Sequence, residues 1–324
     1  YNENIQALYT TFGSEWGKSS LQLGLRVEKV YTTSDQLTQN QKIKNDYFSL
    51  FPTLHYSLKL PKKNEVQISY SRRVNRPVFE DLNPFKDYSN PLMIRMGNPY
   101  LLPEYINSFE VNHSKFFDKT SVYTSIYYRT IDDVIKRLSY LGQDGINYNT
   151  SVNLSKGTNY GVDFIVEREI LKWWRVNANF SYFRTIIKGN SVDGNISNDN
   201  YSWTSKLTSN MNLLKNMTIQ LSANYRAPII TPQGKMYENY GADIAVKKDF
   251  MKDLLSVSFR VSDIFNTQKF NMDAYGTGFY STMIRKRQTQ MAFISVSYKI
   301  NGGIKQKTKK RSVENGSNIE DADF

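Results

Sequence analysis

The side chains that could perform catalysis are few and scattered in this sequence. It contains no Cys and only two His, His55 and His113. His113 is followed by Ser114, and the carboxylates Asp132 and Asp133 come later, so a hydrolytic site would require these groups to converge in space. The strand pattern described below places them far apart. We therefore expect a protein that is not an enzyme, with no catalytic, cofactor-binding or metal-ligating residues.

Four arginines lie together in one stretch of the chain, residues 72–111. The guanidinium groups of Arg72, Arg73, Arg76 and Arg95 could each bind a carboxylate or a phosphate, including the phosphates of lipopolysaccharide. The same stretch contains carboxylates that could instead form ion pairs with these arginines and so hold the loop against the rest of the protein: Glu80, Asp81 and Glu104. Two interpretations stay open: an architectural loop that folds over or into an opening, and a loop that contacts a ligand.

Prolines divide this stretch into turns. Five of them cannot donate a ladder hydrogen bond and restrict the residue before them: Pro77, Pro84, Pro91, Pro99 and Pro103. The dipeptides Asn83-Pro84 and Asn98-Pro99 favour turns, and Gly97 is expected to supply a positive φ. We predict a structured series of turns rather than another strand.

A basic cluster near the C-terminus contributes to the net charge of +12. Lysines and an arginine between Lys305 and Arg311 could bind nucleic acid or an anionic membrane. Acidic residues follow them, and opposite charges in series are typical of a solvated extension. No aromatic residues interleave with these lysines, as binding of single-stranded nucleic acid would require. We expect residues 301–324 to form a charged, disordered periplasmic tail and predict no nucleic-acid partner.

The elements that position these residues are predicted from an alternation with a period of two. Leu21, Leu23, Leu25 and Val27 fall on one face of a strand, and the residues between them are Gln22, Gly24 and Arg26. The same split recurs along residues 1–300, near residues 66–71, 121–128, 174–182, 219–225, 255–261 and 292–299, with weaker repeats between them. This pattern predicts about thirteen strands, each with one apolar and one polar face.

The connections between these strands alternate in length. Short turns are expected near residues 13–17, 61–64, 118–120, 170–172, 214–216 and 249–253, and long polar loops near residues 31–45, 75–103, 138–150, 188–199, 228–237 and 263–282. Short turns at one end and long loops at the other are typical of outer-membrane β-barrels. Strands of about ten residues are long enough to cross a bilayer when tilted. The predicted fold is all-β, an antiparallel transmembrane β-barrel.

A soluble β-sandwich or propeller is the alternative, because a sheet with one solvated face has the same period. Two features favour lipid. The polar faces carry mostly Ser, Asn, Gln and Thr with few charges, and aromatic residues gather toward strand ends, as interfacial girdles do: Tyr70, Tyr128, Trp174, Tyr182, Tyr225 and Tyr298. The chain has no apolar run of roughly 18 residues, which excludes a helical membrane protein.

The direction of the strands gives a further expectation. If the short turns are periplasmic, the first strand runs toward the periplasm and the last one also ends there. Bacterial single-chain barrels have an even number of strands with both ends in the periplasm. We therefore expect additional strands upstream, so that residues 1–300 form the C-terminal part of a larger barrel of about 22 strands.

The proline-rich loop resembles a signature of the outer-membrane β-barrel family common in Bacteroidetes, which looks like the barrel part of TonB-dependent receptors. The residues that match are Arg72, Arg73, Arg76, Asp81, Asn83, Pro84, Gly97, Asn98, Pro99, Pro103 and Glu104, and Arg95 lies among them. A second match is Asp263-Ile264-Phe265-Asn266-Thr267, close to a segment near the end of such receptors. The resemblance covers nearly the whole chain up to Ile300.

The resemblance implies a location and a function. The barrel would lie in the outer membrane of a Gram-negative, Bacteroidetes-type bacterium, in contact with its lipid and lipopolysaccharide. It would take up a large or scarce substrate with the help of a plug domain, a TonB-type energiser and a surface lipoprotein outside this chain. The alternative is a structural or interaction barrel without energised transport. No substrate is predicted.

Overall fold

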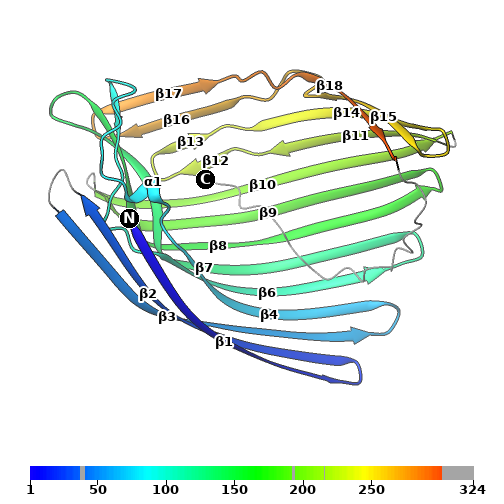
Figure 1. Cartoon of the computed structure of the whole chain (residues 1–324), viewed down its shortest axis with the longest axis horizontal. Coiled ribbons are helices and arrows are strands. Elements are labelled where there is room, and N and C mark those ends of the chain that lie inside the picture. The colour runs from blue at the N-terminus through cyan, green and yellow to red at the C-terminus, as the bar shows by residue number, and fades with distance from the viewer. Residues whose placement is uncertain (37–40, 192–193, 215, 301–324) are drawn as a thin grey trace.

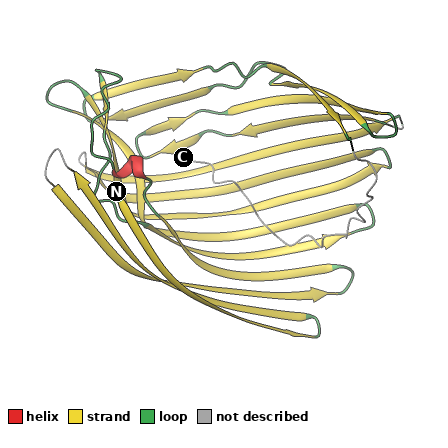
Figure 2. Cartoon of the chain, in the orientation of Figure 1, coloured by secondary structure: helices red, strands yellow, loops and turns green. Residues whose placement is uncertain are grey.

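The fold of the 324-residue chain was obtained as a computed structural model, which describes residues 1–36, 41–191, 194–214 and 216–300. In these residues the structure is almost entirely antiparallel sheet, with one short helix (Figures 1 and 2). The charged segment 301–324, predicted to be a disordered tail, lies outside the described residues. No helix in the described part of the chain is long and apolar enough to cross a membrane.

The main sheet contains 14 strands. Thirteen of them follow one another in a single path, and β5 (Met93–Arg95) pairs in parallel with β8 at its side. The strands of the path are β1 (Asn2–Trp16), β2 (Ser19–Gln36), β3 (Gln41–Leu60), β4 (Asn64–Asn75), β6 (Glu104–Phe116), β7 (Thr120–Leu141), β8 (Asn147–Leu171), β9 (Trp174–Ser191), β10 (Gly194–Leu213), β11 (Met217–Arg226), β14 (Asn239–Phe250), β15 (Leu255–Ser262) and β18 (Met291–Tyr298). The prediction of about thirteen antiparallel strands is confirmed.

The register joins the predicted apolar positions into one continuous face. Leu23 of β2 lies opposite Leu54 of β3, which lies opposite Tyr70 of β4. Residues directly opposite each other in antiparallel strands share a face, so the apolar row continues across the sheet. At its other edge, Phe259 of β15 lies opposite Ile294 of β18. Local alternation and long-range pairing therefore assign the same residues to the same side.

Short turns connect the strands at one end of the sheet, which is the right-hand end in Figure 1. Several of them use left-handed backbone conformations, as tight turns do. Gly17 has φ +60°, Lys62 and Lys63 have φ +60° and +57°, and Leu214 has φ +58°. The predicted short turns at one end of the sheet are confirmed.

Most of the predicted long loops are strands for much of their length. Residues 31–36 and 41–45 continue β2 and β3, and the hairpin of β7 and β8 extends to Leu141 and Asn147. The prediction of polar loops at 31–45, 138–150 and 188–199 is wrong to this extent. The reason is that these hairpin extensions lie beyond the apolar band, so they keep the strand ladder but lose the apolar alternation by which strands were recognised.

Two further predicted loops contain a second sheet at the long-loop end. It has 4 strands in the order β12 (Ile229–Thr231), β13 (Gly234–Met236), β16 (Phe270–Gly276) and β17 (Phe279–Arg285). The helix α1 (Phe79–Leu82) lies at the same end of the molecule (Figure 1). This end, with its loops and extensions, is where the candidate site is found.

Aromatic residues form a row across the apolar face of the main sheet. Ring centroids are 4.8 Å apart for Tyr70 and Phe109, and 6.3 Å apart for Tyr128 and Tyr160. The row continues through three more pairs: Tyr182 and Tyr201 at 6.1 Å, Trp203 and Tyr225 at 4.5 Å, and Tyr225 and Tyr240 at 6.2 Å. Four of the aromatics predicted to lie toward strand ends belong to this row: Tyr70, Tyr128, Tyr182 and Tyr225. Tyr128 and Tyr182 lie near the middle of β7 and β9, because these strands continue past the apolar band, one border of which the row marks.

The sheet is open within the described residues. Its edge strands are β1 and β18, which pair with β2 and β15 on one side only. Both edges are exposed and apolar on one face, with Leu8 76% and Ile294 74% exposed.

Candidate functional site

The segment between β4 and β6, residues 76–103, is the proline-rich loop, and it packs against neighbouring strands. Its backbone pairs with β8 through β5, and the Met96 N–H donates to the Asn149 carbonyl at 3.0 Å. The Asn147 N–H donates to the Leu92 carbonyl at 3.1 Å. The segment is structured, as predicted, since α1, β5 and these hydrogen bonds fix its course, but the expectation that it contains no strand is wrong at β5. We call this segment the signature loop.

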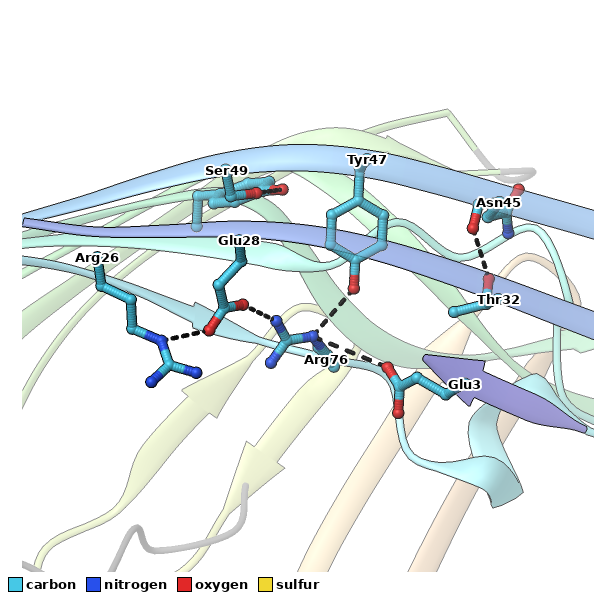
Figure 3. A network of polar contacts seen from close by, with 9 residues as sticks. Glu3, Arg26, Glu28, Thr32, Asn45, Tyr47, Ser49 and Arg76 are labelled. Atoms are coloured by element: carbon cyan, nitrogen blue, oxygen red, sulfur yellow. Dashed lines mark hydrogen bonds and ion pairs between the residues drawn. The ribbon is translucent and has the colours of Figure 1, made fainter. Parts of the chain in front are cut away.

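Arg76 is the centre of a polar network at the start of the signature loop (Figure 3). Its Nε donates to the Tyr47 hydroxyl at 3.0 Å, and its guanidinium forms an ion pair with Glu28. Glu3 lies 3.9 Å away, and Arg26 also pairs with Glu28, at 2.6 Å. The side chain of Glu28 is 5% exposed. Such a buried carboxylate needs its cationic partners, because an unpaired charge in that position is costly.

This network fills a seam between two strands. The ladder of β3 and β4 runs from Leu60 and Asn64 to Thr53 and Ser71, and β3 continues beyond it without β4. The Tyr105 hydroxyl crosses the seam to Ser49 at 2.8 Å, and the Arg72 guanidinium lies 5.1 Å from the Tyr105 ring centroid. Arg72 Nε is buried without a hydrogen-bond partner among the described residues. Arg76 and the Tyr105 hydroxyl therefore bridge the strands where the ladder stops.

Asp81 anchors the middle of the signature loop to the extension of the β7–β8 hairpin. Its Oδ1 accepts from the Arg137 guanidinium and from the Ser151 hydroxyl, each at 2.8 Å. Asn98 Nδ2 donates to the Ser151 carbonyl at 3.2 Å, and Asn98 N–H donates to the Asp81 carbonyl at 2.6 Å. Two of the predicted residues thus meet on one strand of the hairpin.

Gly97 is required for a close approach within the loop. Its N–H donates to the Asn83 carbonyl at 2.7 Å. A Cβ placed on Gly97 would lie 2.5 Å from the Asp81 carbonyl oxygen and 2.6 Å from Asn83 N and O. Gly97 is not among the glycines with positive φ. The expectation that it supplies a positive φ is therefore wrong, and the missing side chain matters because the backbones touch.

Glu104 closes the loop where β6 begins. It is 9% exposed, its Oε2 accepts from Asn75 Nδ2 at 2.6 Å, and its Oε1 accepts from the Ile135 N–H at 2.6 Å. Four of the five prolines are buried or partly buried, namely Pro77, Pro84, Pro99 and Pro103, and Pro91 is exposed. Pro99 and Pro103 also line a cavity of about 40 Å³ that reaches Arg76.

Arg73 and Arg95 differ from the other two arginines. Both are exposed, and neither makes a hydrogen bond or ion pair with its side chain among the described residues. Arg95 lies close enough to Asp87 to lower the pKa of that carboxylate, although hydrogen bonds from Ser89 lower it more. These two guanidinium groups are the ones with free donors for a ligand.

The scattered catalytic candidates do not converge. The register places Asp132 opposite Tyr105, eight residues along β6 from His113, which corresponds to about 26 Å. His113 Nε2 lies 3.3 Å from Asn64 Oδ1. Among the described residues there is no cluster of three or more His, Cys, Asp or Glu that could hold a metal ion.

The extension of the β7–β8 hairpin is a packing element that the alternation pattern did not predict. Val134, Leu138 and Leu154 of β7 and β8 form a buried cluster with Ile187. Gln233, in the turn between β12 and β13, donates to the Ser139 carbonyl and accepts from the Ser139 N–H, both at 2.7 Å. The extension thus connects the signature loop to the second sheet, and Asp133, with φ +59°, lies where it departs from the regular strand.

Asp263, in the second predicted motif, is an architectural residue. It is fully buried, and its carboxylate accepts from the N–H groups of Thr267 and Gln268 at 2.9 and 3.1 Å. The Thr289 hydroxyl donates to it at 2.5 Å. Burial alone would raise the pKa of Asp263, but these hydrogen bonds outweigh that effect and hold the pKa below its ordinary value.

An antiparallel sheet with one apolar face, an aromatic border, short turns at one end and a loop packed at the other defines the wall of a membrane-spanning β-barrel. The comparison with known families agrees. The chain belongs to the outer membrane protein beta-barrel family, which it matches over residues 1–298. It is therefore a protein of the bacterial outer membrane, and the polar face of the sheet is the lumenal one.

Solved structures with a similar fold include transporters and a receptor. The copper transporter OprC is 13% identical to this chain, with a TM-score of 0.69. The match covers 91% of this chain and 47% of OprC. The siderophore receptor PiuA from Acinetobacter baumannii is 15% identical with a TM-score of 0.65, covering 91% and 43%. The FrpB iron transporter from Neisseria meningitidis is 12% identical with a TM-score of 0.60, covering 91% and 45%.

The chain thus spans less than half the length of these structures. No curated protein matches the sequence.

Proposed function

We propose that this chain is the C-terminal barrel wall of a TonB-dependent receptor-like protein that takes up a large or scarce substrate. The observation that carries this proposal is the agreement in fold with receptor barrels over 91% of the chain. The three neighbours are described as copper, siderophore and iron proteins, so metal ions and their complexes are the substrate class to test first.

In this mechanism the chain supplies the wall and part of the mouth. The signature loop is held by Arg76 and Asp81, so it narrows the opening as a fixed element rather than a free gate. The exposed guanidinium groups of Arg73 and Arg95 offer hydrogen-bond donors to an anionic substrate. A plug domain, a TonB-type energiser and a surface lipoprotein would lie outside this chain, and additional strands would pair with the edges β1 and β18 and close the barrel.

Uptake by whole cells tests the proposal. Cells with and without the full gene would be given a panel of radiolabelled ferric complexes and copper, with and without a protonophore that dissipates the inner-membrane gradient. The proposal predicts that at least one probe accumulates only when both the gene and the gradient are present. If no probe accumulates in a gene-dependent way, yet deletion changes outer-membrane assembly, the structural or interaction barrel is favoured instead.

A second arm of the same assay tests whether Arg73 and Arg95 bind the substrate. Replacement of Arg73 and Arg95 by Ala should lower uptake without changing the heat stability of the barrel. A loss of stability with unchanged uptake would assign these arginines to the architecture of the loop.

A further inference from the structure

Three of the nine methionines stand in one row of the second sheet. The register places Met236 of β13 opposite Met272 of β16, and Met272 opposite Met283 of β17. Ile229 of β12 continues the row next to Met236. Because directly opposed residues of antiparallel strands project to the same side, the three thioether side chains occupy one face.

The row lies on the more covered face of this sheet. Met236, Met272 and Met283 are each partly buried. On the opposite face, Tyr280 is 69% and Ile284 66% exposed.

The sheet belongs to the long-loop end of the molecule (Figure 1). The turn between β12 and β13 is fixed to the β7 extension by the reciprocal hydrogen bonds of Gln233 and Ser139. The row is therefore part of the mouth of the barrel rather than of its lipid-facing band.

Thioether sulfur has a distinct ligand preference. It is a soft, polarisable donor without charge, which favours Cu(I) over Mg²⁺, Ca²⁺ and other hard ions. Opposed Cβ atoms are about 5 Å apart, so the outer two methionines of the row are separated by about 10 Å. Methionine has three rotatable bonds, and both outer side chains can therefore lean toward Met272 and converge on one ion.

The same face provides no hard ligands in this row. Asp273, the nearest carboxylate in sequence, belongs to the other face and is engaged by the Tyr237 hydroxyl at 2.7 Å and the Thr282 hydroxyl at 2.9 Å. The neighbouring positions in the Met272 strand and its partner β13 are Ala274 and Gly234. On the same face Ser281 lies opposite Ala274 and Arg285 opposite Phe270. The row itself therefore offers three sulfur atoms, and these flanking positions add a neutral hydroxyl and a cationic side chain but no carboxylate.

We propose that Met236, Met272 and Met283 form a binding site for a soft monovalent metal ion, Cu(I), at the mouth of the barrel. The proposal is based on the register and on thioether chemistry, and it concerns binding only. It stands whether or not the barrel transports.

Titration of the detergent-solubilised full-length protein with Ag(I) tests this site directly. Ag(I) shares the charge and the thioether preference of Cu(I) and does not change oxidation state during the experiment. Binding would be followed by calorimetry and by NMR of methyl-labelled methionines. The test variants are Met272→Leu and the triple replacement of Met236, Met272 and Met283 by Leu, because Leu for Met is a volume-conserving exchange.

The matched control is Met251→Leu, at a turn methionine that is 64% exposed and lies outside the row. We expect saturable Ag(I) binding in the wild type and in this control, with shifts of the three methyl signals, and an affinity at least about tenfold weaker in Met272→Leu. Absence of saturable binding, or equal affinity in the wild type and the triple variant, would show that the row is apolar packing only and overturn the proposal.

Discussion

Arg76 shows how one residue of the signature loop supports the sheet around it. Its guanidinium group connects Tyr47 of β3 and Glu28 of β2 to the chain that leaves β4. Sequence reasoning identified Arg76 but left open whether it binds a ligand or the wall. Its partners lie 29 and 48 residues away, so only the folded sheet could reveal them.

Replacement of Arg76 by Ala should destabilise the barrel by about 2 kcal/mol. This is less than the loss of a fully buried ion-pair partner, because Arg76 is itself 25% exposed. Lysine should restore part of the loss, since it keeps the charge but not the planar fork. The measurement is the temperature at which heat-modifiable migration in a gel is lost. Arg73→Ala is the control, expected within about 0.5 kcal/mol of wild type; equal effects of the two replacements would contradict the assigned role of Arg76.

Asp263 should make barrel stability depend on pH. Its folded-state pKa is lowered because the hydrogen bonds it accepts from Thr289, Thr267 and Gln268 outweigh the effect of burial. The carboxylate therefore stabilises the fold at pH values above its unfolded-state pKa, about 3.9. That contribution is lost as the pH falls through the lower folded-state pKa.

The variant Asp263→Asn should lose about 1–3 kcal/mol at pH 7, because one acceptor oxygen is replaced by a donor. Unfolding temperatures of the variant and the wild type should converge as the pH is lowered below 3.9. Asp118→Asn is a suitable control, since the Asp118 side chain is 100% exposed. A difference between Asp263→Asn and wild type that is constant from pH 7 to low pH would refute the role of the charge.

At the scale of elements, the contact between Gly97 and the Asp81–Asn83 backbone determines the shape of the signature loop. Gly97→Ala should push the backbone at position 97 away from the Asp81–Asn83 backbone and lower the free energy of unfolding by about 1–3 kcal/mol. The loop should then be more exposed. Limited proteolysis of the purified barrel should then cleave within residues 76–103. Gly13→Ala, at a glycine with no atom within 4 Å of the added Cβ, should leave the loop resistant; cleavage of neither variant would contradict the close packing.

Strands that cross the bilayer were predictable from the sequence, whereas those at the mouth were not. Leu21 to Val27 and Trp174 to Tyr182 alternate because one face meets lipid and the other the lumen. The extensions of β2, β3, β7 and β8 have water or other loops on both sides, so no period of two distinguishes them. For the same reason the pattern did not predict β12, β13, β16 and β17. The methionine row was not predicted either, because its members are brought together only by pairing across strands.

At the scale of the whole molecule, the low mean hydropathy is explained by strands that have one apolar and one polar face. The chain has a mean hydropathy of −0.55, yet it belongs to an outer-membrane family. The polar half of each strand faces the lumen, so an average over residues conceals the membrane-facing half. The fold class and the strand number followed from this alternation, while the contacts of the signature loop depended on residues far apart in sequence.

The central claim is that alternate residues of each strand face lipid and the lumen, and a cysteine scan of β9 tests it most directly. Because the chain contains no Cys, single cysteines at positions 175–181 can be spin-labelled without a background signal. In reconstituted membranes, labels at Val176, Ala178 and Phe180 should be accessible to oxygen dissolved in the lipid. Labels at Arg175, Asn177, Asn179 and Ser181 should be accessible to a water-soluble nickel complex. Accessibility without this period of two, or access of the nickel complex to every position, would contradict the account.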